Sequence, residues 1–176
     1  RQRWGRLDFL LHSVAFAPRE DLHARVVDCS AEGFALAMDI SCHSFIRMTK
    51  LAEPLMTGGG CLMTVTFFGA EKVVEHYNMM GPVKAALESS VRYMAAELGA
   101  QGIRVHALSP GAMATRAASG IDRFDELLAR TADRAPTHHL VTIEDVGPCA
   151  AFLASDAAKQ LTGLTLYIDG GYHIVG

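Results

Sequence analysis

Residues 61–110 read CLMTVTFFGAEKVVEHYNMMGPVKAALESSVRYMAAELGAQGIRVHALSP, and the fold class follows from this stretch. It contains an apolar run over Cys61–Phe67, a segment rich in Ala, Met and Glu from Tyr77 to Leu98, and a second apolar run over Arg104–Pro110. Runs that are apolar on both faces are typical of strands in a parallel sheet covered by helices. Gly99 ends the middle segment as a helix terminator. The stretch therefore predicts a strand, a helix and a parallel strand.

The same alternation continues on both sides of this unit. Two more apolar runs, Arg6–Ser13 and Leu164–Gly170, suit buried strands. Helical patterns cover Ala31–Met56, Ile121–Asp133 and Thr142–Lys159, the last of which opens with Thr-x-x-Asp, a capping-box variant. Alternating strands and helices predict an α/β fold with a doubly wound parallel sheet.

Composition limits the class of protein. The chain has 176 residues, 50% of them hydrophobic and 20% charged, which is enough for one domain with a sizeable core. With no repeat or linker, residues 1–176 are expected to belong to one domain. The net charge of −3 disfavours a nucleic acid or an anionic membrane as partner. We also expect no membrane span, because no run of about 18 apolar residues occurs.

Cysteine and histidine usage gives two further expectations. The four cysteines stand far apart without a C-x-x-C motif, which favours reduced thiols in the cytoplasm over disulfides or structural zinc. The eight histidines are scattered, apart from the adjacent His138 and His139, which could not share one metal on a helix face. No metal site is predicted.

A glycine-rich phosphate-binding turn is missing from the sequence. Dinucleotide-binding sheets begin with a strand, a G-x-G-x-x-G turn and a helix N-terminus that takes the pyrophosphate. Residues 58–60 are glycines, but they precede a strand and read as a turn. Either the protein binds no dinucleotide, or the first βαβαβ half of its sheet lies outside this sequence.

Tyr77 and Lys84 form a Y-x6-K pair on the predicted helix. Seven residues are nearly two turns, so both side chains would lie on one face, about 10 Å apart along the axis. A lysine ammonium near a phenol favours the phenolate and would make Tyr77 a better acid near neutral pH. The alternative is a half-buried tyrosine and a surface lysine on an amphipathic helix. Pro82 between them requires the helix to begin near Tyr77.

The surroundings of this pair carry a family resemblance. Two predicted strands end in Thr64–Ala70 and in Ser109–Gly111, and open α/β sheets bind ligands at such carboxyl ends. The chain resembles the short-chain dehydrogenase/reductase superfamily in its Y-x6-K pair, in P-G-x3-T (Pro110, Gly111, Thr115) and in T-G-x4-I-D-G-G (Thr162 to Gly171).

Longer strings resemble one branch, the NADH-dependent enoyl-acyl-carrier-protein reductases of bacterial type II fatty acid synthesis. They are HSVAFAP (12–18), DIS (39–41), GAEK (69–72), YNMMGPVKAALE (77–88), VRY (91–93), TRAASGI (115–121) and VTIEDVG (141–147). The resemblance runs from about Trp4 to Gly176. It implies a Rossmann-like sheet that is incomplete at the N-terminus, with residues 1–176 as the C-terminal portion of a single domain.

The resemblance also implies a reaction and its site residues. NADH would reduce the trans-2 double bond of an enoyl thioester on acyl carrier protein. Tyr77 would donate a hydrogen bond to the thioester oxygen, and Lys84 would hold the nicotinamide ribose. The other implied cofactor contacts are Ser13, Val14, Ala15, Gly111, Met113 and Thr115. The implied substrate pocket consists of Phe67, Tyr77, Ala117 and Ile121, with Ala117–Leu128 as a lid, and the implied assembly is a homotetramer.

Three departures from the branch bear on activity. Phe67 stands where the branch carries a second tyrosine, Ala112 stands where proline is common, and the glycine-rich segment is absent. Loss of the hydroxyl at residue 67 is expected to cost about 0.5–1.5 kcal/mol without abolishing activity. Without the first half of the sheet, an apolar edge formed by Leu7, Phe9, Leu10 and Leu11 would face water, so residues 1–176 alone are expected to be poorly soluble and to bind no NADH measurably.

Two other functions stay open. One is a non-catalytic or truncated relative that keeps the scaffold for binding or assembly. The other is a ketoacyl thioester reductase of the same superfamily. The choice between NADH and NADPH also stays open, because the residue that reads the adenosine ribose falls in the part of the sheet that this sequence lacks.

Overall fold

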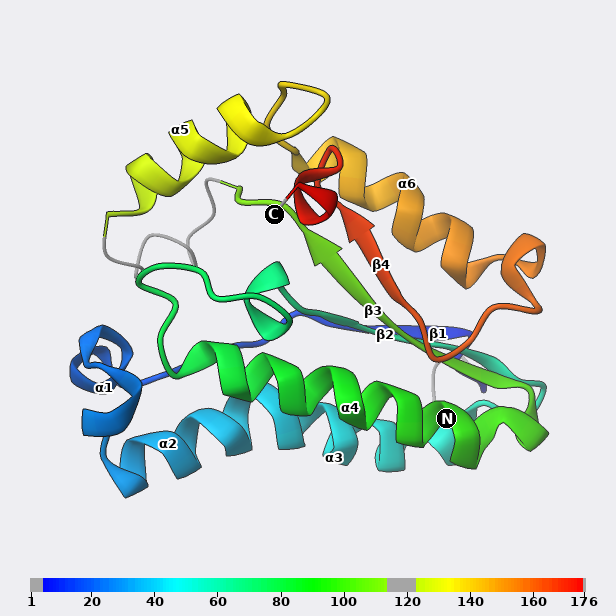
Figure 1. The fold of residues 1–176 in the computed structure, drawn as a ribbon. Coiled ribbons are helices and arrows are strands. Elements are labelled where there is room, and N and C mark those ends of the chain that lie inside the picture. The colour runs from blue at the N-terminus through cyan, green and yellow to red at the C-terminus, as the bar shows by residue number, and fades with distance from the viewer. Residues whose placement is uncertain (1–4, 114–122, 176) are drawn as a thin grey trace.

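The computed structural model describes residues 5–113 and 123–175, which form a sheet with helices on both faces (Figure 1). The strands lie side by side in chain order and all pair in parallel: β1 (Phe9–His12), β2 (Gly60–Val65), β3 (Ile103–Pro110) and β4 (Thr165–Ile168). Each strand falls on one of the four predicted apolar runs. The predicted doubly wound parallel sheet is confirmed.

Helices cover the two faces of the sheet unequally. On one face lie α2 (Ala31–Met38), α3 (Ser44–Ala52) and the long α4 (Met80–Leu98). The other face carries α6 (Ile143–Ala154), while α5 (Phe124–Arg134) and the short α1 (Arg19–His23) lie away from the sheet (Figure 1). Short 3-10 turns complete the fold: Val26–Asp28, Glu53–Leu55, Phe68–Ala70, Gly99–Gln101, Asp156–Ala158 and Tyr172–Ile174.

The predicted helix over Ala31–Met56 is confirmed as one continuous helical stretch, but it is not uniform. A π turn over Asp39–His43 joins α2 to α3. Wide turns of this kind are rare and occur mainly as single insertions in helices, often at functional sites. The predicted Thr142–Asp145 capping box is also confirmed, since the Asp145 carboxylate accepts from the Thr142 main-chain nitrogen at 2.9 Å.

The predicted start of the helix at Tyr77 is wrong. His76 and Asn78 adopt left-handed backbone conformations, with φ of 63° and 43°, and these break the helical path on both sides of Tyr77. The helix begins only at Met80. Pro82 then falls in the first helical turn, where its missing N–H breaks no helical hydrogen bond.

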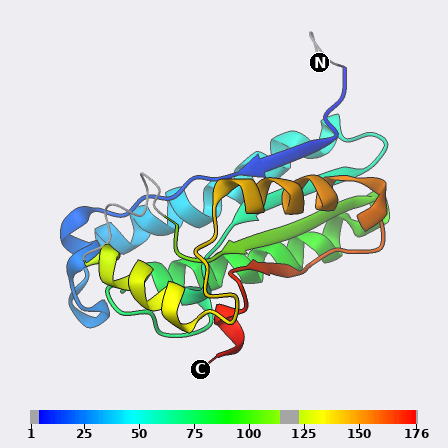
Figure 2. The ribbon, with the colours of Figure 1, turned by 90° about the horizontal axis from the view of Figure 1, so that it is seen from above.

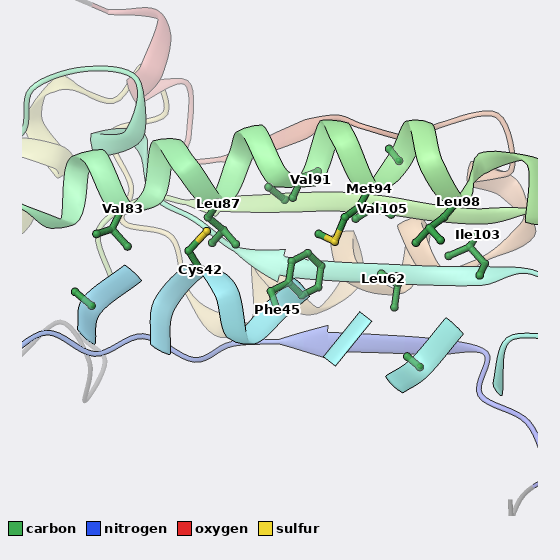
Figure 3. Packing of buried hydrophobic residues seen from close by; sticks show 14 of the residues in the cluster. Cys42, Phe45, Leu62, Val83, Leu87, Val91, Met94, Leu98, Ile103 and Val105 are labelled. Atoms are coloured by element: carbon green, nitrogen blue, oxygen red, sulfur yellow. The ribbon is translucent and has the colours of Figure 1, made fainter. Parts of the chain in front are cut away.

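The larger core lies between β1–β3 and the α2–α4 layer (Figure 3). It is built on α4 by apolar residues at helical spacing, which pack on the sheet and on α2 and α3. Figure 3 shows the side chains of this core: Cys42, Phe45, Leu62, Val83, Leu87, Val91, Met94, Leu98, Ile103 and Val105. The smaller core beneath α6 consists of Cys61, Met63, Leu108, Leu153 and Ala158.

Strand β1 forms one edge of the sheet. Figure 2 shows α6 running alongside β1 without lying over it. Phe9 and Leu11 are accordingly 55% and 46% exposed. Leu10 instead packs against the larger core, because successive side chains of a strand point to opposite faces. Leu7, which precedes the strand, also packs against that core. The predicted apolar edge is therefore present but narrower than expected, since only two of its four residues are open to water.

Two findings concern the cysteines and the membrane. Cys29, Cys42, Cys61 and Cys149 all carry free thiols. Among the described helices, none combines the length and the apolar character that a bilayer crossing requires.

Candidate active site

A pocket of about 440 Å³ opens at the carboxyl ends of β1, β2 and β3. This is the edge of an open parallel sheet where ligands bind, and the volume lies in the usual range for small-molecule sites. The lining is mostly apolar with a few polar groups: Ser13, Val14, Ala15, Phe16, Ala17, Leu22, Val65, Thr66, Phe67, Tyr77, Met80, Lys84, Pro110, Gly111, Ala112, Met113 and Phe124.

Most of the site residues predicted from sequence meet in this pocket. Tyr77 and Lys84 both line it, although they do not share a helical face. Also in the lining are the expected cofactor contacts Ser13, Val14, Ala15, Gly111 and Met113, and the expected substrate contact Phe67. Three predicted residues, Thr115, Ala117 and Ile121, lie outside the described residues.

Tyr77 is held by the segment that precedes it. Its ring packs edge-on against Phe67, with ring centroids 4.9 Å apart and the planes at 63°. Its other neighbour is Gly69, where a Cβ atom would lie 2.4 Å from the Tyr77 Cδ1 atom. Only glycine leaves room for the ring there, so the Phe67–Gly69 turn fixes where the phenol lies.

Lys84 lies in the second turn of α4 and is buried. Its Nζ donates a hydrogen bond of 2.7 Å to the carbonyl oxygen of Val65, at the end of β2. Burial lowers the pKa of Lys84 to about 8, against the raising effect of nearby Cys42 and Glu88. At neutral pH the buried amine therefore keeps its positive charge.

The expected activation of Tyr77 as an acid is wrong in direction. Burial, followed by the negative charge of Glu88, raises the pKa of Tyr77 far above its ordinary value. The larger of the two causes is the loss of water around the phenolate. Tyr77 is consequently a phenol that keeps its hydrogen at neutral pH, which suits a hydrogen-bond donor rather than a proton source.

Glu88 is a site residue that the sequence analysis missed. It follows Lys84 by four residues on α4, and its carboxylate accepts a 2.6 Å hydrogen bond from the Thr66 hydroxyl. Lys84 and Glu88 thus hold the adjacent residues Val65 and Thr66 of the pocket wall. Their i, i+4 spacing was the available signal, because such residues lie on one face of a helix.

Burial also raises the pKa of Glu88, while the Thr66 hydrogen bond and Arg92 act in the opposite direction.

Through residues 5–113 and 123–175, no group of three or more His, Cys, Asp or Glu side chains is arranged to hold a metal ion. The polar chemistry of the pocket thus rests on a phenol, an ammonium, two hydroxyl side chains and main-chain groups.

Comparison with known proteins agrees with this arrangement. The family profile described as "Enoyl-(Acyl carrier protein) reductase" matches residues 1–173. The NADH enoyl-acyl-carrier-protein reductase FabI of Aquifex aeolicus is 48% identical over 176 residues, covering 99% of this chain and 65% of the relative. The NADH enoyl-acyl-carrier-protein reductase 1 of Rhizobium meliloti is 46% identical over 175 residues, covering 99% of this chain and 64% of the relative.

Solved structures give the same result. The crystal structure of the Aquifex aeolicus enzyme matches with a TM-score of 0.96 at 48% identity, over 99% of this chain and 68% of that one. The Anaplasma phagocytophilum enzyme in complex with NAD matches with a TM-score of 0.95 at 48% identity, over 99% and 67%. The chain spans about two thirds of the length of these relatives. It belongs to the enoyl-acyl-carrier-protein reductase family.

Proposed function

We propose that the pocket reduces the trans-2 double bond of an enoyl thioester carried by acyl carrier protein, with NADH as reductant, in bacterial type II fatty acid synthesis. The observation that carries the proposal is the meeting of a protonated phenol, Tyr77, and a charged amine, Lys84, in one apolar pocket at the strand ends. The relatives named as NADH reductases and the relative solved with NAD support it.

The residues present fit part of a nicotinamide cofactor. The Lys84 ammonium has three hydrogens, of which the Val65 carbonyl takes one, so two are available for the hydroxyl groups of a ribose. Ser13, Val14 and Ala15 line the pocket directly after β1, and Gly111 and Met113 line it after β3. We assign these residues to the cofactor, and Thr115 to its pyrophosphate as the resemblance implies.

The proposed chemistry places one task on each polar group. When bound, NADH would supply a hydride to the β-carbon of the enoyl thioester, and negative charge would then develop on the thioester oxygen. Tyr77 donates a hydrogen bond to that oxygen as its negative charge develops, which stabilises the transition state. Lys84 adds positive charge nearby, and the α-carbon then takes a proton from solvent. Because the raised pKa of Tyr77 keeps its hydrogen in place, the phenol serves as donor throughout the pH range of the cell.

Phe67 and Phe124 supply apolar surface to the pocket lining. We assign Phe67 to the wall against the acyl chain, together with Ala117 and Ile121 as the resemblance implies. Phe67 offers no hydroxyl to the thioester, so its contribution is the edge-on contact that orients Tyr77. We further propose that residues 1–176 form the C-terminal portion of one domain, and that the protein is a cytoplasmic homotetramer.

The test is NADH oxidation by the protein as its native gene encodes it, with crotonyl and acetoacetyl thioesters of acyl carrier protein. Oxidation with the crotonyl thioester alone is the expected result. Oxidation with the acetoacetyl thioester would instead establish a ketoacyl reductase, and turnover of neither would establish a non-catalytic relative. Tyr93→Phe is the matched control for Tyr77→Phe, because Tyr93 lies exposed on α4.

A further inference from the structure

His12 is a buried histidine whose ring links β1 to β2 and α3, directly before the pocket-lining residue Ser13. It ends β1 and is 1% exposed. Its Nδ1 lies 3.0 Å from the hydroxyl of Thr64, its partner residue on β2. Its Nε2 lies 2.7 Å from the hydroxyl of Ser44, the first residue of α3. Both ring nitrogens are therefore engaged, one with the sheet and one with a helix.

The hydrogen-bond partners of Ser44 determine which ring nitrogen carries the hydrogen. The Ser44 oxygen lies 2.6 Å from the carbonyl oxygen of Ile40, which can only accept. The single hydroxyl hydrogen of Ser44 is thus used, and toward His12 the Ser44 oxygen must accept. Nε2 of His12 is consequently the donor. In the uncharged ring Nδ1 is then bare and accepts from Thr64.

The uncharged ring is the form that this environment favours. Burial, followed by the positive charge of Lys84, lowers the pKa of His12. The Thr64 hydroxyl could also donate to the carbonyl oxygen of His12, but that distance is 3.3 Å, against 3.0 Å to Nδ1. The shorter contact, to Nδ1, completes an ordered chain of hydrogen bonds from Thr64 through His12 and Ser44 to Ile40.

The segment that follows His12, residues 13–15, is also held at its other end by a serine hydroxyl. The buried hydroxyl of Ser41 donates to the carbonyl oxygen of Phe16 at 2.9 Å and accepts from its nitrogen at 2.8 Å. Ser41 lies in the π turn and Ser44 directly after it. The residues between the two anchors, Ser13, Val14 and Ala15, are those that line the pocket. The π turn and the first residue of α3 therefore present two serines to one short segment.

We propose that His12, with its ring hydrogen on Nε2, is a positioning residue that sets the Ser13–Ala15 wall of the pocket, with Ser41 fixing the far end of the same wall. The ring itself touches no ligand in this role. It acts by transmitting the position of α3 to the end of β1. That the Ser13–Ala15 wall binds the cofactor rests on the proposed function. That His12 and Ser41 hold this wall in place does not.

The direct test is the tautomer of His12, read from the ¹⁵N chemical shifts and ring couplings of the uniformly labelled protein. The expected result is a single uncharged form with the hydrogen on Nε2. A hydrogen on Nδ1, or an even mixture of the two tautomers, would overturn the proposal. This measurement needs no variant and no cofactor.

Variants of Ser44 test whether the anchor holds the wall. Ser44→Ala removes the acceptor of the Nε2 hydrogen, so amide exchange at Phe16, whose nitrogen donates to Ser41 at the far end of the segment, should become about ten-fold faster. Ser44→Thr keeps the hydroxyl and should retain wild-type exchange. Ser90→Ala is the matched control, because Ser90 likewise donates to the carbonyl four residues earlier, Ala86, but makes no contact with His12. Equal exchange in Ser44→Ala and wild type would contradict the anchoring.

Steady-state kinetics distinguish a failure of the positioning role of His12 from a failure of the proposed function. In Ser44→Ala the KM for NADH should rise about ten-fold while kcat changes less than two-fold, the signature of a disturbed binding wall. A fall in kcat at unchanged KM would overturn the positioning role. If the wild-type protein oxidises no NADH, the proposed function fails, while the tautomer and the exchange rates still decide the anchoring.

Discussion

The two faces of the sheet treat buried polar groups differently. On the α2–α4 face the deeply buried Lys84 keeps its charge at neutral pH, because a carbonyl and nearby Glu88 compensate its burial. On the α6 face the fully buried His106 has a pKa lowered to about 4 by burial and by Arg104, and its Nδ1 has no hydrogen-bond partner. Of these two buried side chains, Lys84, on the face with the larger core, is the one that carries a charge at neutral pH.

The difference teaches where this fold can hold a costly group. Burying a charged side chain lowers stability unless the surroundings offset it. The core on the α2–α4 face is continuous from α2 to the end of α4, whereas the core under α6 consists of five buried residues. We infer that the stability contributed by the larger core offsets the free-energy cost of burying the charge of Lys84.

The largest expected effect comes from opening the larger core. Phe45→Ala removes a fully buried ring from α3 and should lower the free energy of unfolding by about 3–5 kcal/mol. Leu153→Ala, at a fully buried position of the α6 core, should lower it by about 2–3 kcal/mol. Urea unfolding of both variants measures the two changes. A larger loss in Leu153→Ala would reverse the ranking of the two faces.

Tyr77→Phe should have the next largest effect, on the reaction rather than on folding. Loss of one donor to the developing oxyanion should lower kcat by about 10²–10³-fold with crotonyl thioester. The free energy of unfolding should stay within about 0.5 kcal/mol of wild type, because the ring and its contacts with Phe67 and Gly69 remain. Undiminished turnover in this variant would remove the phenol from the mechanism.

Lys84→Met tests how much the buried charge of Lys84 lowers the free energy of unfolding. Between pH 8 and 10.5 the unfolded chain binds more protons at Lys84 than the folded chain, so wild-type stability should rise with pH across this interval. At pH 7 the variant should be about 1–2 kcal/mol more stable, since the methionine needs no compensation but Val65 loses its donor. Urea unfolding at several pH values would contradict this if both proteins showed the same slope above pH 8.

The smallest effect on stability is expected at the sheet edge. Phe9→Thr combined with Leu11→Thr replaces exposed apolar side chains on β1 and should change the free energy of unfolding by less than about 0.5 kcal/mol. The double variant should be more soluble, because an apolar edge strand promotes association. Leu10→Thr is the control on the same strand, and it should destabilise the fold because Leu10 packs on the larger core. A double variant as insoluble as wild type would show that the apolar edge of β1 does not cause association.

Sequence alone was sufficient for the framework of the molecule. The four apolar runs became the four strands. Apolar spacing indicated the helix over residues 31–56, and a composition rich in Ala, Met and Glu indicated the helix that ends at Leu98, although not its start. The motifs at the ends of the second and third strands identified the position of the pocket, because the carboxyl ends of parallel strands meet at one edge. These features depend on local pattern, which the sequence carries.

The details that depend on tertiary contact could not be predicted. Tyr77 lies in a turn because His76 and Asn78 adopt left-handed conformations, which no apolar period encodes. Its raised pKa follows from burial among residues distant in the chain, so the expectation built on Lys84 alone had the wrong sign. The hydrogen bonds of His12 with Thr64 and Ser44 join three separate segments, and nothing local distinguished this histidine from the other seven.

The parallel order of the strands has a consequence for how the molecule folds. No pair of neighbouring strands is joined by a hairpin, and Phe9 meets Cys61 only after roughly fifty intervening residues have been looped out. The entropy of closing such loops must be met before the pairing stabilises anything, which slows folding relative to chains rich in local contacts. The shortest loop joins β2 to β3 through α4, so we expect assembly to nucleate on this unit and β1 to dock later.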